Sequence, residues 1–329
     1  MGNIAEHIPA FRFGHKVYPQ NMVEASTPVE TGQIWFVDGD KAANGDGKTW
    51  EDAFADLESA CNVLSAGDVI YVATRSNVLT DTDPISYTEN AILDTPNCSI
   101  IGVSRGRTQG GLPQLKVGTT TTQAILTVRA PGCLIANLGF NGAGATGGGI
   151  LLDDDGGSTK SAFGTMIVGC HFKNCKGTDA TGAETGGAIQ WSAAGGAWQV
   201  SIVGNQFYKN VGDITLMGTS GSVPQDVLIA NNDFLGTAAA VDCHIFMAGS
   251  GMANFMIRDN YFAGVLPALS GGNNVRYVIL VGTGLFANNY FASTDTTTGF
   301  GAAKASAKIP TTVGIPHNYS DGGLIVREA

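Results

Sequence analysis

The sequence predicts an all-β protein built as a β-solenoid, and three observations indicate this class. Glycine supplies 46 of the 329 residues, about twice its usual share of roughly 7%. Charged residues make up only 14% of the chain, against about 25% in an ordinary globular domain. From about residue 100 onward, a short phrase ending in phenylalanine recurs at a nearly fixed interval. Together these features favour many tight turns around a long buried core.

The composition also excludes several classes of protein and partner. Hydrophobic residues at 43% rule out general disorder, and a net charge of −10 with 18 scattered basic residues argues against a nucleic-acid partner. No apolar run is long enough to span a membrane, and the first ten residues lack the basic and apolar regions of a secretory signal. The six cysteines show no zinc or CxxC spacing, so we interpret them as small buried hydrophobes. These features predict synthesis in a cytoplasm.

The first predicted element is a strand at residues 34–37. The loop that follows it nearly matches the residue pattern of an EF-hand calcium loop. Its ligand positions 1, 5 and 12 hold Asp40, Asn44 and Glu51, whereas position 3 holds Ala42, where an oxygen ligand belongs. Calcium binding and a glycine-rich turn are the two interpretations. A strand in place of the entering helix favours the turn, so we assign no metal site.

A helix is predicted over residues 50–64, before a strand at 69–72. Thr49 is placed as its N-cap, and Asp52 occupies the position of a capping-box acid. The apolar residues fall at i, i+3, i+4, i+7, i+10, i+11 and i+14, which puts them on one helical face. They are Trp50, Ala53, Phe54, Leu57, Ala60, Cys61 and Leu64.

The recurring phrase organises the remainder of the chain. Its closing phenylalanines, which lie 32, 35, 27, 28 and 29 residues apart, are Phe140, Phe172, Phe207, Phe234, Phe262 and Phe291. A degenerate earlier copy is at 99–103, and a period in this range is typical of a solenoid. Each period also carries a second strand-like run, at 149–152, 188–191, 213–218, 242–247 and 276–282. Two or three short strands and no helix per period predict a β-solenoid in which equivalent residues stack about 4.8 Å apart.

When successive coils stack, equivalent residues of the repeat are expected to form two internal columns, one of phenylalanine and one of asparagine. The phenylalanines are expected to form an aromatic stack, and Asn205, Asn232, Asn260 and Asn289 occupy the position two residues before each Phe. We expect these amides to form a hydrogen-bonded ladder at an inner turn. Leu138 and Cys170 hold that position in the first coils, so the ladder is expected to begin late. Replacing a ladder asparagine with leucine should cost on the order of 1–3 kcal/mol.

The Asn-x-Phe coils, with the entry FVDG…GDGKTWEDAF…AGDVIYV, resemble the pectin-lyase-like right-handed parallel β-helix over about residues 34–291. The resemblance implies that the helix at 50–64 caps the open end of the coil. The predicted units are an N-terminal arm (1–33), a cap strand and amphipathic helix (34–66), a parallel β-helix of about eight coils (67–291) and a C-terminal extension (292–329).

Enzymes of this superfamily cut acidic polysaccharides with clustered carboxylates, often with calcium and a basic residue on one face. The chain lacks the Asn-Thr-Asp, Gly-His-Gly and Arg-Ile-Lys set of polygalacturonases and the Arg-x-Pro-x-x-Arg of pectate lyases. We therefore assign no catalytic, cofactor-binding or metal-binding residues. The superfamily also includes adhesins and phage spike and capsid-decorating proteins, so fold alone does not choose the function.

Three weaker candidate sites remain. The acidic run 153–155 is interpreted as a solvated turn. Asp242 and His244, with Asp213 one coil earlier, are predicted to point outward and share one surface, where an exposed His beside an Asp can act as a general base; a polar surface is the commoner interpretation. Trp191 and Trp198 suit either stacking on a sugar ring or, more commonly, burial in a core or subunit contact.

The sequence favours a non-enzymatic virion protein of a tailed phage, either capsid-decorating or spike-like. We expect a homotrimer, assembled in the host cytoplasm and attached through residues 1–33 to the major capsid protein or another virion protein. A surface glycan is a further candidate partner; nucleic acid and membrane are not. The alternatives are an extracellular polysaccharide lyase or glycoside hydrolase and a glycan-binding adhesin without catalysis.

Overall fold

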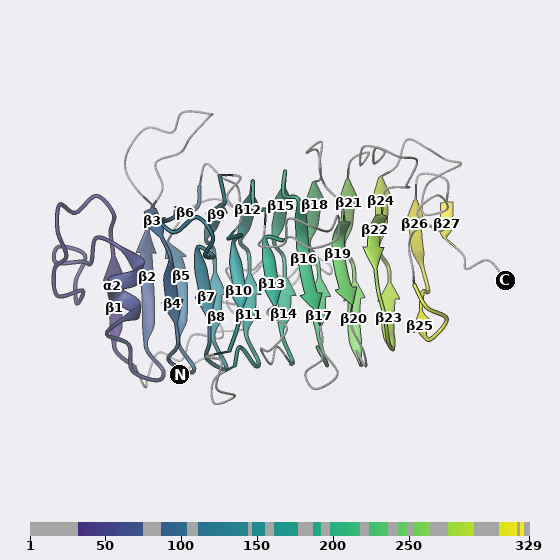
Figure 1. Cartoon of the computed structure of the whole chain (residues 1–329), viewed down its shortest axis with the longest axis horizontal. Coiled ribbons are helices and arrows are strands. Elements are labelled where there is room, and N and C mark those ends of the chain that lie inside the picture. The colour runs from purple at the N-terminus through teal and green to yellow at the C-terminus, as the bar shows by residue number, and fades with distance from the viewer. Residues whose placement is uncertain are drawn as a thin grey trace, which may run out of the picture.

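The computed structural model is a right-handed parallel β-helix formed by three parallel sheets (Figure 1). It describes residues 32–74, 87–103, 111–143, 147–154, 161–176, 187–191, 198–217, 224–235, 243–248, 253–263, 276–292, 309–320 and 323–325. The predicted N-terminal arm therefore lies outside the described residues, apart from its last two.

Each coil runs through sheet A, then sheet B, then sheet C. Sheet A contains β1 (Ile34–Val37), β2 (Val69–Ala73), β5 (Ser99–Val103), β8 (Leu134–Ala136), β11 (Met166–Val168), β14 (Ser201–Val203), β17 (Leu228–Ala230), β20 (Phe255–Arg258), β23 (Gly284–Ala287) and β25 (Val313–Gly314). Sheet C contains β4 (Ala91–Leu93), β7 (Leu126–Val128), β10 (Ile150–Leu152), β13 (Ile189–Trp191), β16 (Gly212–Met217), β19 (Cys243–Ala248) and β22 (Arg276–Ile279).

Sheet B lies between them in chain order. It contains β3 (Tyr87–Glu89), β6 (Gln114–Val117), β9 (Gly139–Asn141), β12 (His171–Lys173), β15 (Gln206–Tyr208), β18 (Asp233–Leu235), β21 (Tyr261–Ala263), β24 (Tyr290–Ala292), β26 (Asn318–Ser320) and β27 (Gly323–Ile325). Equivalent residues pair in register, as Ile135, Ile167 and Ile202 do. Sheet A places eight strands, β2 to β23, within residues 67–291, which confirms the predicted number of coils.

The helix does not end at residue 291, contrary to the prediction. Strand β25 pairs in parallel with β23, and β26 pairs in parallel with β24, so residues 313–320 add a further coil. The phenylalanine repeat does not mark this coil, because Ser320 stands where the earlier coils have phenylalanine, opposite Phe291. Strand β27 then turns back antiparallel to β26 at the C-terminal end (Figure 1).

An α-helix does cap the N-terminal end, but it is much shorter than predicted. Helix α2 spans Leu57–Cys61, and its N-cap is Asp56, whose carboxylate accepts from the Ser59 amide. The predicted cap bond from the Asp52 amide to Thr49 Oγ1 forms at 3.1 Å, but it closes a turn. Phe54 is the reason: its amide donates to the Phe36 carbonyl and its carbonyl accepts from Asp38, so this segment pairs with β1 instead of coiling.

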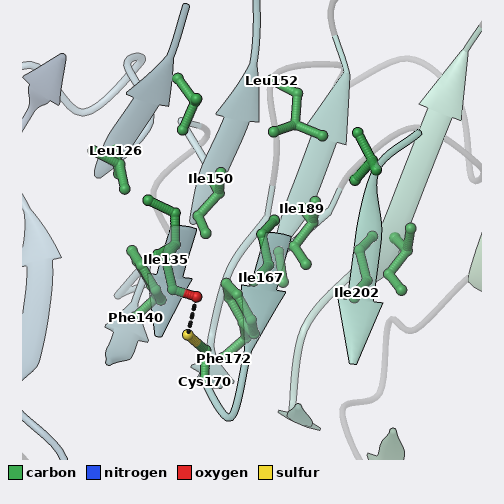
Figure 2. Packing of buried hydrophobic residues seen from close by; sticks show 14 of the residues in the cluster. Leu126, Ile135, Phe140, Ile150, Leu152, Ile167, Cys170, Phe172, Ile189 and Ile202 are labelled. Carbon is green, nitrogen blue, oxygen red and sulfur yellow. Dashed lines mark hydrogen bonds between the residues drawn. The ribbon is translucent and has the colours of Figure 1, made fainter. Parts of the chain in front are cut away.

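The predicted phenylalanine column forms the spine of the core. Phe140, Phe172, Phe207, Phe234, Phe262 and Phe291 stack with centroids 4.6–5.1 Å apart and ring planes within 9° of parallel. All six are fully buried. Figure 2 shows the first two rings among the isoleucine and leucine rows of sheets A and C. Aromatic contacts of this kind add about 0.5–1.5 kcal/mol per pair beyond burial.

The asparagine ladder also forms as predicted, between sheets A and B. The residue before each rung has positive φ, which suits Gly204, Asn231 and Asp259 in the tight turn. Side-chain Nδ2 atoms donate to the Oδ1 of the next rung at 3.0–3.1 Å along Asn205, Asn232, Asn260, Asn289 and Asn318. Asn318 is a further rung that was not predicted, because Ser320 follows it where the other rungs are followed by phenylalanine. In the first coils, Leu138 and Cys170 fill the position, as expected.

Candidate functional site

The near-EF-hand loop uses its polar side chains to hold itself against α2. Asn44 Oδ1 accepts from the Ala55 amide at 2.7 Å, and Asn44 Nδ2 donates to Ser59 Oγ at 2.8 Å. Asp40 and Glu51 are exposed. Strand β1 precedes the loop, as predicted. In this structure, Asn44 serves as the tie between the loop and the helix that follows it.

The acidic run at 153–155 is divided among different environments. Asp153 Oδ2 lies 3.0 Å from both Nε and a terminal guanidinium nitrogen of Arg129, one coil earlier. Asp154 bridges antiparallel to Ser161, and Asp155 lies outside the described residues. Asp153 is therefore a partner in a coil-to-coil ion pair, and its carboxylate is only 15% exposed. The interpretation as a solvated turn was wrong for this residue.

The two candidate tryptophans differ in environment. Trp191 is 4% exposed and belongs to the core, which confirms the commoner interpretation. Trp198 is half-buried and meets Phe163 of the preceding coil edge-on, with centroids 6.4 Å apart. Phe163 is itself 39% exposed, so of the two candidate tryptophans only Trp198, together with Phe163, presents aromatic surface to solvent.

The structure brings Asp213 and His244 together, as predicted, but inside the core. Asp213 Oδ2 lies 2.5 Å from His244 Nδ1, and the exposed fractions of the two side chains are 4% and 0%. The His244 ring packs against Phe234 and Phe262, with centroids at 5.5 and 5.7 Å. The outward orientation predicted for His244 is therefore wrong. Asp242, the third member of the predicted cluster, lies outside the described residues.

His244 was predicted to point outward from regular alternation along the whole strand, and the strand does not alternate near its start. Asp213 and Ile214 are neighbours in sequence and both are buried, as are His244 and Ile245 one coil later. Strands β16 and β19 therefore each bury two consecutive residues near their start, where regular alternation would bury only one of them. The hydrophobic pattern of the sequence does not reveal this departure from alternation.

A third residue, Asn210, completes the buried polar cluster and was not anticipated. Its Nδ2 donates to Asp213 Oδ1 at 2.9 Å and to the Phe172 carbonyl at 3.2 Å, while its Oδ1 accepts from the Cys175 amide at 2.9 Å. The cluster thus links three successive coils through Cys175, Asn210–Asp213 and His244. In the sequence, Asn210 and Asp213 lie three residues apart. Unlike the asparagines of the ladder, this pair does not recur from coil to coil, so the sequence does not mark it as a cluster.

An imidazole paired with a carboxylate can act as a general base when it touches a substrate. Here both groups are enclosed by core phenylalanines, and the carboxylate's other oxygen is held by Asn210. Buried polar groups of this kind are stabilising when their partners are in place and costly when a partner is lost. The arrangement therefore suits a structural connection between coils.

Two further titratable groups are buried in the first coils. Glu89 Oε1 and Oε2 accept from the Leu57 and Glu58 amides at 2.9 and 3.2 Å, at the start of α2. Burial raises the pKa of the Glu89 carboxyl to about 7, although these two hydrogen bonds lower it. Burial, with the charge of Lys173, lowers the pKa of the His171 imidazole to about 4. Burial therefore favours the neutral form of both groups relative to their ordinary behaviour.

Within the described ranges, no three His, Cys, Asp or Glu side chains gather as a metal site would require. In the same part of the chain, no helix has the length and apolar character needed to cross a membrane.

No family model matches the chain, and no curated protein matches it. Solved structures with similar folds include a pectate lyase (10% identity, TM-score 0.40, covering 81% of this chain and 65% of that one). ORF18 of Geobacillus virus E2 has 10% identity and a TM-score of 0.44 over 88% of this chain and 60% of that one. A rhamnogalacturonan lyase has 13% identity and a TM-score of 0.40 over 79% and 68%.

This chain spans less than two thirds of the length of the first two of these structures. Likeness at such low identity concerns fold alone. The three parallel sheets, with their in-register strand pairing, establish the parallel β-helix fold from the chain itself.

Proposed function

We propose that the chain is a non-enzymatic structural protein of a tailed-phage particle, of the capsid-decorating or spike type. In this proposal it forms a homotrimer and is anchored to the major capsid protein or another virion protein through residues 1–33. The alternatives are a polysaccharide lyase or hydrolase and a glycan-binding adhesin, and the experiments below distinguish them from this proposal.

One observation carries the proposal: the interior polar side chains are used to join coils. Each central rung of the asparagine ladder touches three coils. Asn232, for example, accepts from the backbone and side chain of Asn205, and donates to the Ile202 carbonyl and to Asn260. The His244–Asp213–Asn210 cluster links coils in the same way, out of reach of solvent. These groups serve rigidity, and they are enclosed where chemistry would need access.

A rod of this construction suits a particle that must persist outside a cell. Parallel pairing satisfies the strand edges along its length, while α2 with β1 and the antiparallel β27 lie at its two ends (Figure 1). The low charge content and the glycine turns are consistent with a framework fixed by backbone pairing. Stability in a repeat of this kind accumulates from contacts between neighbouring coils.

Deletion of residues 1–30 tests the particle assignment. The full-length protein should co-sediment with purified phage particles and be labelled on them by antibody in electron micrographs. The truncated protein should keep the circular dichroism and thermal midpoint of a folded β-helix but remain in the particle-free fraction. Normal incorporation of the truncated protein, or absence of the full-length protein from particles, would contradict the proposal.

A panel of acidic and neutral glycans tests the enzyme alternative. We expect neither unsaturated products nor new reducing ends. Turnover that is abolished by Asp153→Ala or Asp242→Ala would overturn the non-enzymatic assignment, and binding without products would favour an adhesin.

A further inference from the structure

Sheet A carries a second buried apolar cluster, on the face that points away from the core. On strands β2, β5, β8 and β11, the side chains that enter the core are those of Ile70, Ile100, Ile135 and Ile167. The residues on either side of them point outward. These outward residues include a separate buried cluster, which consists of Val69, Ile101, Leu134, Ala136 and Val168. Each is at most 7% exposed, and we call these five residues the outer cluster.

Neighbouring strands of sheet A do not account for this burial. Val69 and Leu134 lie in the same outward column as Met256, through the register of the intervening strands. Met256 also has a strand on each side, yet it is 40% exposed, whereas Val69 and Leu134 are 4% and 7% exposed. The described apolar side chains that pack against the outer cluster, Tyr71 and Met166, belong to sheet A itself. The difference requires a cover from outside the sheet.

The chain enters the described part of the structure beside the outer cluster. The Gln33 amide donates to the Asp68 carboxylate at 2.7 Å, and the Gln33 carbonyl accepts from the Val69 amide at 3.0 Å. Gly32 packs so closely on Gly67 that an added Cβ would lie 2.0 Å from the Gly67 carbonyl oxygen. The 31 residues that precede Gly32 therefore start next to the first member of the outer cluster.

The residues just before Gly32 have the pattern of an extended segment with one weakly polar face. Small or apolar residues alternate there with polar residues and proline: Val23, Ala25, Thr27 and Val29 with Glu24, Ser26, Pro28 and Glu30. Alternate side chains of an extended segment share a face, so both glutamates lie opposite the valines. At about 3.3 Å per residue, seven residues span roughly 23 Å, whereas the four strands of the outer cluster span roughly 14 Å.

We propose that residues 23–29 lie extended across the outer face of sheet A and cover the outer cluster with Val23, Ala25 and Val29. Removal of apolar surface from water on both sides of the contact stabilises this arrangement. Pro28 suits it, because proline favours an extended backbone and has no amide that needs a strand partner.

This inference goes beyond the proposed function, because it concerns a contact within one chain. Residues 1–22 remain available for attachment to a particle when residues 23–29 lie on sheet A. Particle attachment is measured by co-sedimentation, whereas the cover is measured on the isolated protein, so failure of one proposal is distinguishable from failure of the other.

Photochemical carbene labelling of the isolated full-length protein, located by mass spectrometry, tests the inference. Val29→Asp places a charge on the apolar face of the segment. Labelling at Leu134 should then rise by up to about sixfold, as its exposed fraction goes from 7% towards the 40% of Met256. Labelling at Met256, which lies outside the outer cluster, is the internal reference.

Ser26→Asp is the matched control. It adds the same charge on the opposite face of the segment, so labelling at Leu134 should stay unchanged. Circular dichroism should be unchanged in both variants, because the outer cluster shares no residue with the core cluster.

Three outcomes would overturn the inference. Labelling at Leu134 in the wild type could already equal that at Met256, it could stay unchanged in Val29→Asp, or it could rise as much in Ser26→Asp. Protection of Leu134 that grows with protein concentration and survives Val29→Asp would assign the cover to a second copy of the chain instead.

Discussion

The first and last coils of the β-helix form the same turn but place different kinds of residue inside it. Between sheets A and B, a residue with positive φ precedes an inward-pointing residue in both regions. In the first coils that inward residue is Leu138 or Cys170, packed among apolar side chains. From Asn205 onward it is an asparagine whose amide bonds the coils on both sides. Figure 2 shows Cys170 in the earlier arrangement, its thiol near the Ile135 carbonyl.

The difference shows that backbone geometry does not require the ladder. The turn closes equally well over leucine, so the asparagines add cohesion between coils to a turn that already exists. The junction lies at Cys170, whose amide donates to Asn205 Oδ1 at 2.8 Å. Upstream of it, this inner turn is filled by apolar side chains; downstream, a buried chain of amides at the same turn joins the coils as well.

The largest expected effect comes from breaking the ladder. Asn232→Leu removes both acceptor contacts to Asn205 and leaves the Ile202 carbonyl without its amide donor. At about 1–3 kcal/mol for each buried group that loses a partner, we expect a loss of about 3–6 kcal/mol in unfolding free energy, above the sequence-based expectation. Urea denaturation measures it.

Cys170→Ala is the control for the ladder variant. It alters the equivalent position one coil before Asn205, but it keeps the backbone amide that bonds the Asn205 carboxamide. Only a small apolar volume is lost, so the free energy of unfolding should fall by about 1 kcal/mol. Equal losses in the two variants would show that the asparagines are no more than space-filling residues.

The buried cluster in the later coils should produce the next effect. His244→Leu leaves the Asp213 carboxyl in the core with Asn210 as its remaining side-chain partner, which should cost about 3–5 kcal/mol. Adding Asp213→Asn should recover most of that loss, because its amide oxygen can keep the Asn210 bond without a buried charge. A double variant no more stable than His244→Leu alone would show that the loss came from packing around Phe234.

The two internal columns were predicted correctly because their residues repeat at the period of the coil. The phenylalanine and asparagine columns repeat because each parallel coil presents the same environment, and the sequence records it directly. The helix at 50–64 was predicted too long because apolar spacing does not reveal that Phe54 pairs with β1. Features that do not repeat could not be predicted in this way. They include the inward orientation of His244 and the contact that places Glu89 at the start of α2.

Two buried groups of the first coils, Glu89 and His171, should make the stability of the protein depend on pH. Glu89 has a folded-state pKa of about 7, above its ordinary value of 4.5, so it should lower stability as pH rises from 4.5 to 7. His171 has a folded-state pKa of about 4, below its ordinary 6.5, so its contribution is present above pH 6.5 and lost as pH falls to 4. Each amounts to about 3 kcal/mol at its limit.

These two contributions oppose each other between pH 4.5 and 6.5, so the wild-type protein should change little there. Glu89→Gln should reveal a stability that rises with pH, and His171→Gln one that falls with pH. Chemical denaturation at several pH values measures both slopes. Parallel profiles in the two variants would show that neither buried group governs the pH dependence.

The smallest expected effect is on the rate of cysteine alkylation, which reports how far local opening spreads from a substituted residue. The described cysteines whose side chains are buried lie between residues 61 and 175, ahead of the ladder. Burial raises the pKa of the Cys170 and Cys175 thiols to about 12, so in the folded protein they should react with alkylating reagents only after local opening. Their labelling therefore reports opening of the coils at the junction.

In a stack whose coils contact only their neighbours, a lesion in the ladder should loosen the nearest coils first. In Asn232→Leu, native-state labelling at Cys170 and Cys175 should accelerate about tenfold, because their amides bond Asn205 and Asn210 of the next coil. Cys98, several coils earlier, should change by less than about threefold. Peptide mapping by mass spectrometry separates the three sites. Equal acceleration at all three would mean that both regions open as one cooperative unit, so the ladder does not define a separate half of the molecule.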